Sequence, residues 1–176
     1  MKEFVLFMFC CLTIFPCCKV LNPDENLTLQ RKDYTGDELK TDGYYYVLWQ
    51  NDYDVYTRVY FLYRNGIVLS IGHSYPSQNL DFVEKEILQE KNSNFKTKDH
   101  WGIFIIDNNA IQYEKWVGST GFRTCLSKST GYIKNDTTIH FTDRYYSETN
   151  KTLSIDEVWH FKSFSPKPDS TNNFIK

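Results

Sequence analysis

Short runs of aromatic and β-branched residues, separated by turn residues, dominate the chain from Gly43 to Phe164. Such side chains pack well on a pleated sheet, and the Asn, Asp and Gly residues between the runs mark turns. Consecutive strands at this short spacing favour an all-β, mostly antiparallel fold, and closing the sheet on itself removes its exposed edges. We therefore predict an up-and-down meander barrel, closed or half-open, of about eight strands over residues 43–49, 55–63, 67–73, 101–106, 110–117, 122–134 (broken near Gly131), 137–146 and 153–164.

The second and third predicted strands are joined by Asn65-Gly66. Asn-Gly between two such runs is the strongest short hairpin signal, because both residues tolerate a positive φ. A loop of two residues would place Leu62 opposite Leu69 on the two strands.

One amphipathic helix is predicted around residues 79–91, with Ser77 or Asn79 as its N-terminal cap. A stripe of this width usually packs on the core, here as a lid or a side cover of the sheet. A helix that lies on a membrane needs a basic polar face, which this segment lacks. The apolar residues at helical spacing are Leu80, Val83, Ile87 and Leu88.

The N-terminus carries an uncharged apolar run over residues 4–15. A spanning helix needs about 20 such residues, whereas a signal peptide needs a run of this length. The run ends in Ile14-Phe15-Pro16-Cys17-Cys18, which resembles the lipobox of bacterial lipoproteins. That resemblance implies a lipid on one cysteine: Cys17 has Ile14 at the aliphatic position, and Cys18 has the small neighbour. We expect an exported protein anchored in a bacterial cell envelope, facing the periplasm or the surface, or otherwise a soluble secreted one.

These signals divide the chain into four parts. We expect a leader over residues 1–18, a polar tether over 19–42, the barrel over 43–164 and a tail over 165–176. Four apolar side chains of the tether and tail are candidates for docking on the barrel, namely Leu27, Leu29, Phe174 and Ile175.

Composition argues against several functional classes. The formal net charge of −2 provides no basic face for nucleic acid. Cys125 is the one cysteine beyond the leader, and a small buried hydrophobic role suits it better than a reactive thiol. No Ser stands in a Gly-x-Ser-x-Gly turn, and no phosphate loop is present. The adjacent Asp156 and Glu157 would point to opposite faces of a strand, so they cannot act as a general acid–base pair by themselves. We expect neither an enzymatic activity nor a cofactor.

His140 and His160 are weak candidates for a metal site. If Asn150 is central in the last hairpin, the two histidines face each other, whereas a shifted register pairs His160 with Thr142. A metal site normally needs three or four ligands, and no third is evident nearby. Exposed histidines on the polar face of a strand are the more usual interpretation.

The chain resembles small bacterial envelope lipoproteins with a lipocalin-like barrel. The resemblance rests on the first strand, Gly43-Tyr-Tyr-Tyr-Val-Leu-Trp49, on the meander order and on the late Trp159-His160-Phe161. In addition, residues 164–172 resemble the ends of small bacterial proteins. It implies a barrel around one small apolar ligand, as eight strands allow. The alternative is a solid barrel that serves a structural role or binds a protein partner. Side chains with a flat face and a polar tip are the candidates for lining a pocket: Tyr44, Tyr46, Trp49, Tyr60, Trp101 and Trp159.

Overall fold

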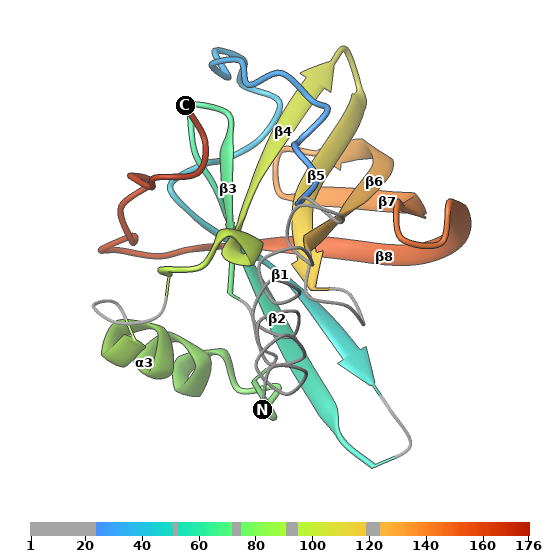
Figure 1. The fold of residues 1–176 in the computed structure, drawn as a ribbon. Coiled ribbons are helices and arrows are strands. Elements are labelled where there is room, and N and C mark those ends of the chain that lie inside the picture. The colour runs from blue at the N-terminus through green and yellow to red at the C-terminus, as the bar shows by residue number, and fades with distance from the viewer. Residues whose placement is uncertain (1–23, 51–52, 72–74, 91–94, 119–123) are drawn as a thin grey trace, which may run out of the picture.

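The computed structural model describes residues 24–50, 53–71, 75–90, 95–118 and 124–176. Its strands form one closed antiparallel barrel in chain order, and β8 pairs with β1 to complete the ring (Figure 1). The predicted all-β barrel is therefore confirmed, with eight strands in the described chain. They are β1 Gly43–Gln50, β2 Val55–Leu62, β3 Ile67–Ser70, β4 Trp101–Asp107, β5 Ala110–Gly118, β6 Thr124–Asn135, β7 Thr138–Tyr146 and β8 Lys151–Ser163.

The helix α3 (Leu80–Glu90) lies in the long connection between β3 and β4, followed by the short 3-10 helix η1 (Lys98–His100). Asn79 caps α3, because its Oδ1 accepts hydrogen bonds from the N–H groups of Asp81 at 3.0 Å and Phe82 at 3.4 Å. The predicted helix and one of its two predicted caps are thus confirmed. The predicted strand over residues 67–73 ends earlier, at Ser70, and residues 72–74 lie outside the described chain.

The predicted register of the β2–β3 hairpin is wrong by one residue. Leu62 pairs with Val68, not with Leu69. The cause is a longer loop: the Gly66 N–H donates to the Tyr63 carbonyl at 3.0 Å, and Gly66 then takes a φ of 76°. A turn followed by a left-handed glycine adds one residue to the two-residue loop that Asn-Gly favours.

The last hairpin differs from both predicted registers. His140 pairs with Val158, and His160 pairs with Thr138. The loop covers residues 147–150, and Asn150 is its last residue, with a φ of 52°, instead of its centre. A register shift between Phe141 and Asp143 then displaces the pairing once more.

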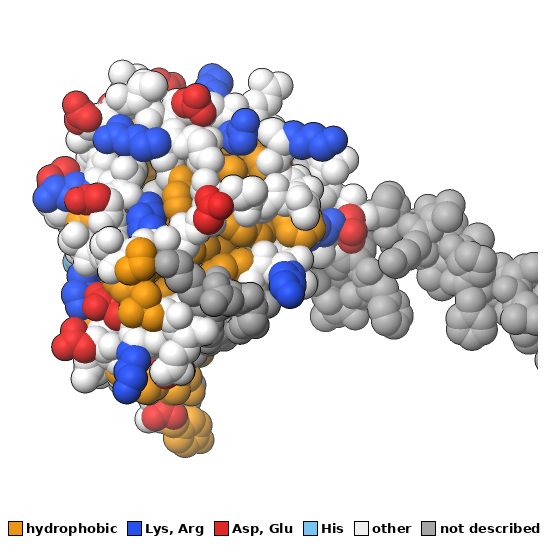
Figure 2. Space-filling view, turned by 90° about the vertical axis from the view of Figure 1, so that its left-hand side faces the viewer, with side chains coloured by type: hydrophobic (Ala, Val, Ile, Leu, Met, Phe, Trp, Pro, Cys, Tyr) orange, Lys and Arg blue, Asp and Glu red, His pale blue; other side chains and the backbone are white. Residues whose placement is uncertain are grey.

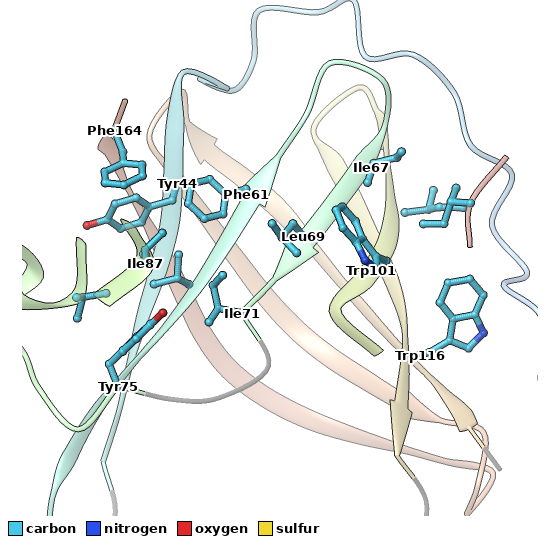
Figure 3. Close-up of a cluster of buried hydrophobic side chains, with 14 of the residues drawn as sticks. Tyr44, Phe61, Ile67, Leu69, Ile71, Tyr75, Ile87, Trp101, Trp116 and Phe164 are labelled. Carbon is cyan, nitrogen blue, oxygen red and sulfur yellow. The ribbon is translucent and has the colours of Figure 1, made fainter. Parts of the chain in front are cut away.

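Two apolar clusters lie on opposite faces of the sheet, because neighbouring residues in a strand point to opposite faces. Tyr45 belongs to the interior cluster, to which all eight strands contribute, and its neighbour Tyr44 belongs to the outer cluster. Figure 3 shows the outer cluster, where Tyr44 and Ile87 of α3 meet Phe164 from the start of the tail. The helix is therefore a side cover of the barrel, as predicted.

One face of the molecule is mixed in charge. Figure 2 shows a face on which Lys and Arg side chains are interspersed with Asp and Glu, with apolar side chains between them. No single sign of charge dominates that face.

Residues 24–42, expected as part of a polar tether, lie against the barrel. The carboxylate of Glu114 on β5 is 1% exposed and accepts three hydrogen bonds, from the N–H and hydroxyl of Thr28 and from the N–H of Leu29. The Trp116 indole donates to the Glu25 carbonyl at 2.7 Å. Of the four docking candidates, Leu27, Leu29 and Ile175 pack on the outer cluster, while Phe174 stays 37% exposed.

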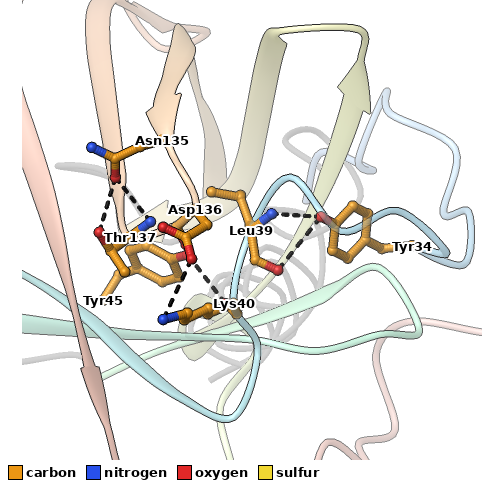
Figure 4. A network of polar contacts seen from close by, with 7 residues as sticks. All are labelled: Tyr34, Leu39, Lys40, Tyr45, Asn135, Asp136 and Thr137. Carbon is orange, nitrogen blue, oxygen red and sulfur yellow. Dashed lines mark hydrogen bonds and ion pairs between the residues drawn. The ribbon is translucent and has the colours of Figure 1, made fainter.

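The same segment then closes one end of the barrel, as Figure 4 shows. The Lys40 N–H donates to the carbonyl of Asp136 in the β6–β7 turn, and the two side chains form an ion pair at 3.3 Å. The Tyr45 hydroxyl bonds the carbonyls of both residues, and the Tyr34 hydroxyl accepts the Leu39 N–H at 2.7 Å. This end, which we call the closed end, is where the loops 63–66, 108–109 and 136–137 gather.

No helix within the described residues is long and apolar enough to cross a bilayer. The predicted leader, with Cys17 and Cys18, lies outside the described chain.

Candidate functional site

A hollow occupies the barrel interior toward the end opposite the closed one, which we call the open end. Its floor is aromatic: the rings of Tyr60 and Trp159 stack with centroids 3.8 Å apart, and Tyr113 meets both rings edge-on. The cavity volume is about 240 Å³. Inward-facing side chains of five strands and one loop residue line it: Arg58, Tyr60, Ser70, Ile71, Tyr113, Lys115, Val117, Ser127, Ser129, Arg144 and Tyr146.

The charge of this lining is positive. Its described members include three cations, Arg58, Lys115 and Arg144, and no carboxylate. One carboxylate reaches a cation from just outside the lining, because Arg144 Nη2 lies 2.9 Å from Glu157 Oε2. The other oxygen of Glu157 accepts the Trp159 indole N–H at 2.6 Å, which ties this ion pair to the aromatic floor.

Arg144 is held firmly in place. Its Nε donates to the Ser129 hydroxyl at 3.0 Å, and both side chains of its ion pair with Glu157 are only 15% exposed. Burial alone would lower the pKa of Arg144, but the negative charge of Glu157 outweighs this effect and raises the pKa. The guanidinium therefore stays charged.

Lys115 is the cation with the least compensation. Its Nζ donates to the Ser70 hydroxyl at 3.0 Å, and among the ion pairs of the described residues none involves Lys115. Burial, reinforced by the charges of Arg144 and Arg58, lowers its pKa from 10.5 to about 8, although Asp99 acts in the opposite direction.

Two tyrosine hydroxyls add hydrogen-bonding capacity to the cavity. Burial, followed by the charge of Glu157, raises the pKa of Tyr60 to about 12, so its hydroxyl stays protonated. The hydroxyl of Tyr113 is fully buried and has no hydrogen-bond partner within 3.5 Å in the described part of the protein, although an interaction with the Ser70 side chain acts on its pKa against the effect of burial. A buried hydroxyl without a close partner is costly.

The cavity continues sideways where β1 leaves β8. These strands pair only from Gly43 to Tyr46, after which the β1–β2 hairpin projects past the barrel (Figure 1). A second hollow of about 310 Å³ lies in this gap. Arg58 and Arg144 line both hollows, while the carboxylates of Asp156 and Glu157 line only the second. Arg58 also covers the Trp49 ring, with its guanidinium carbon 5.2 Å from the ring centroid.

The six aromatic residues proposed from the sequence lie in different places. Tyr60 lines the cavity and Trp159 lies beneath it. Tyr44 and Trp101 belong to the outer cluster, and Tyr46 packs against that cluster. Trp49 lies at the side gap and is 44% exposed.

The two histidines are not cross-strand partners. His140 Nε2 lies 2.7 Å from Asp156 Oδ1, and its Nδ1 lies 2.8 Å from the Tyr132 hydroxyl. The ring of His160 instead lies against Tyr46, with centroids 5.8 Å apart. The described residues contain no group of three or more His, Cys, Asp or Glu side chains that could hold a metal ion. Cys125 is buried in β6 as a free thiol, as predicted.

The sequence interpretation missed the cations and serines of the cavity. Arg58, Lys115 and Arg144 each stand in a strand where a charged residue normally faces solvent. Alternate residues of a strand point to the same face, so Arg58 shares its face with Tyr60, and Lys115 shares its face with Tyr113. This spacing from interior residues is the signal that identifies them.

Comparisons with protein-family models, with curated proteins and with solved structures find no match to this chain.

Proposed function

We propose that this protein binds a small anionic molecule in the open end of its barrel. The supporting observation is the cavity of about 240 Å³ with three cationic side chains and one adjacent carboxylate. A cation held away from water without an ion-pair partner, as Lys115 is among the described residues, is costly, and an anionic ligand removes that cost. The sequence favoured an apolar ligand, and the part of the lining that suits one consists of Tyr60, Ile71, Tyr113, Val117 and Tyr146.

The ligand class follows from size and chemistry. Pockets for drug-sized molecules span about 300–1,000 Å³, so a cavity of about 240 Å³ suits something smaller. Stacked aromatic rings favour a flat apolar body, and guanidinium groups favour a carboxylate or phosphate. A short aromatic or aliphatic carboxylate meets both conditions. The alternative of a solid barrel that only contacts a partner is less well supported, because this interior is hollow.

An exported, lipid-anchored location completes the proposal. It rests on the apolar run and on Cys17 or Cys18 in the sequence. The described chain starts at the open end, where Asp24 accepts the Thr124 N–H at 2.7 Å and pairs with Lys98 at 2.7 Å. A lipid on either cysteine would therefore hold the open end close to the membrane surface.

Calorimetry with benzoate and with its neutral analogue benzamide tests the binding proposal on the purified full chain. We expect benzoate to bind and benzamide to bind at least ~10-fold more weakly, because one charge-assisted contact contributes about 1.5–3 kcal/mol. Lys115→Met should weaken benzoate binding, whereas Lys85→Met, an exposed cation on α3, should not. Equal binding of benzoate and benzamide, or no heat from benzoate, would overturn the proposal.

A further inference from the structure

Lys115 reaches the cavity because the neighbouring strand makes room for it. On β4 it pairs with Gly102, where an added Cβ would lie 2.9 Å from the Lys115 Cβ and 2.9 Å from the Tyr113 ring. On β6 it pairs with Ser127, another lining residue. The glycine thus leaves the lysine stem and the Tyr113 ring side by side, both directed into the cavity.

The surroundings of the Lys115 amine are those of a nucleophile. Its hydrogen-bond acceptor is a neutral hydroxyl, Ser70 Oγ at 3.0 Å, rather than a carboxylate. Two further cations, Arg58 and Arg144, line the same cavity. Proteins activate lysine for attack on carbonyl carbons by this combination of desolvation and neighbouring positive charge.

The fraction of reactive amine follows from the lowered pKa. A lysine with a pKa of about 8 is roughly one-quarter neutral at about pH 7.5, whereas one at the ordinary value of 10.5 is ~0.1% neutral. The Lys115 amine is therefore on the order of 200-fold richer in its nucleophilic form than an exposed lysine.

We propose that Lys115 reversibly captures small anionic carbonyl compounds, namely aldehydes or α-keto acids, as imines inside the cavity. This inference rests on the proposed anion-binding function, since Arg58 and Arg144 would hold the anionic end of the compound. The amine lone pair attacks the carbonyl carbon, and the displaced amine proton passes to the carbonyl oxygen to form a carbinolamine. That hydroxyl then leaves as water with the remaining amine proton while the C=N bond forms, so no oxidant or reductant is consumed.

Tyr113 supplies the group that this step needs beside the amine. Tyr113 lines the cavity together with Lys115, and its hydroxyl has no close hydrogen-bond partner among the described residues, so it would donate to the carbonyl oxygen as negative charge develops there. Its pKa lies well above the ordinary value because of burial, which keeps the proton on the oxygen. We assign it as a donor to the reacting oxygen.

Borohydride trapping with glyoxylate tests the proposal on the full chain. Glyoxylate joins an aldehyde to a carboxylate and is small enough for the cavity. We expect one carboxymethyl group per protein at about pH 7.5, mapped to Lys115 by peptide mass spectrometry and formed at least ~20-fold faster than on the exposed Lys85. Propanal, which lacks the carboxylate, should label Lys115 more slowly.

Variants separate this inference from the proposed function. Lys115→Arg should lose the mapped product, because a guanidinium does not form the imine, while Lys85→Arg should keep both benzoate binding and the product on Lys115. Tyr113→Phe should slow labelling of Lys115 several-fold. If benzoate binds but glyoxylate labels Lys115 no faster than Lys85, imine capture is refuted and anion binding stands. If neither compound is held, both proposals fail.

Discussion

Replacing Glu157 with Gln isolates the counter-charge of the cavity. Gln has the same shape and keeps an oxygen for the Trp159 indole N–H, which Glu157 accepts at 2.6 Å. The change removes only the negative half of the pair with Arg144. At an effective dielectric constant of about 20, two unit charges ~4 Å apart attract by roughly 4 kcal/mol. Breaking a buried pair from one side costs about 3–5 kcal/mol.

Two features reduce this cost for Glu157→Gln. The amide still accepts a hydrogen bond, and the Arg144 guanidinium keeps its bond to Ser129 at 3.0 Å. We therefore expect the free energy of unfolding to fall by about 2 kcal/mol. The unpaired Arg144 should then bind an anion more tightly, and a gain of about 1.4 kcal/mol corresponds to ~10-fold higher affinity for benzoate.

Urea unfolding with and without benzoate measures both effects in one series. The variant should be less stable than the parent without benzoate and should gain more stability from a given benzoate concentration. Asp156→Asn is the matched control, because it removes the same charge from the adjacent residue, whose side chain is 88% exposed and pairs with His140. It should change each quantity little. A folded Glu157→Gln protein whose benzoate affinity is unchanged or lower would refute the reasoning.

Three further predictions test the pKa values, a turn and a buried hydroxyl. Burial lowers the pKa values of Lys115 and Lys167 to about 8, so between pH 8 and 10.5 the unfolded chain binds more protons than the folded protein. The free energy of unfolding should therefore rise with pH through that window. Urea titrations at several pH values should show a smaller rise for Lys115→Met. Gly66→Ala should destabilise by more than about 1 kcal/mol in the same assay, because Gly66 has a φ of 76° and the new Cβ would lie 2.2 Å from the Lys32 carbonyl oxygen; an unchanged midpoint would contradict this. Tyr113→Phe should leave the free energy of unfolding unchanged or raise it by up to about 1 kcal/mol, since it removes a hydroxyl without a close partner in the described chain. A fall of more than about 1 kcal/mol in the free energy of unfolding would show that the hydroxyl has a structural partner.

Local signals were enough to predict the elements of this fold. Aromatic and β-branched runs identified the strands, and the spacing of Val83 and Ile87 identified the helix and its buried side. The predicted break near Gly131 is a register shift between Thr130 and Gly131 in the β6–β7 pairing. These features depend on a few neighbouring residues, so the sequence carries them directly.

Registers were harder to predict because they depend on loop geometry. A single left-handed residue decides each loop: Gly66 extends the β2–β3 loop by one residue, and Asn150 ends the last loop instead of centring it. The His140–His160 metal candidate depended on that register, and the two histidines pair instead with Val158 and Thr138.

The cavity could not be predicted because both faces of several strands are buried. In β2, Arg58 and Tyr60 face the interior, while Thr57 and Phe61 face outward yet are 0% exposed. The apolar alternation that normally separates inside from outside is therefore lost. Arg58 shares its side of β2 with Tyr60, but this places Arg58 inside the barrel only once Tyr60 is known to face inward.

The inward-facing residues of each strand change from apolar to charged along the strand, which explains why one barrel has two different ends. Along the inward-facing side of β2, Leu62 packs at the closed end and Arg58 lines the open one. Along β5, Ile111 and Lys115 repeat this arrangement. The apolar halves pack together and stabilise the fold, so the open halves can carry charges that would be too costly in the core. A ligand that presents its anionic group to these cations and its flat body to the Tyr60–Trp159 stack would match both halves at once.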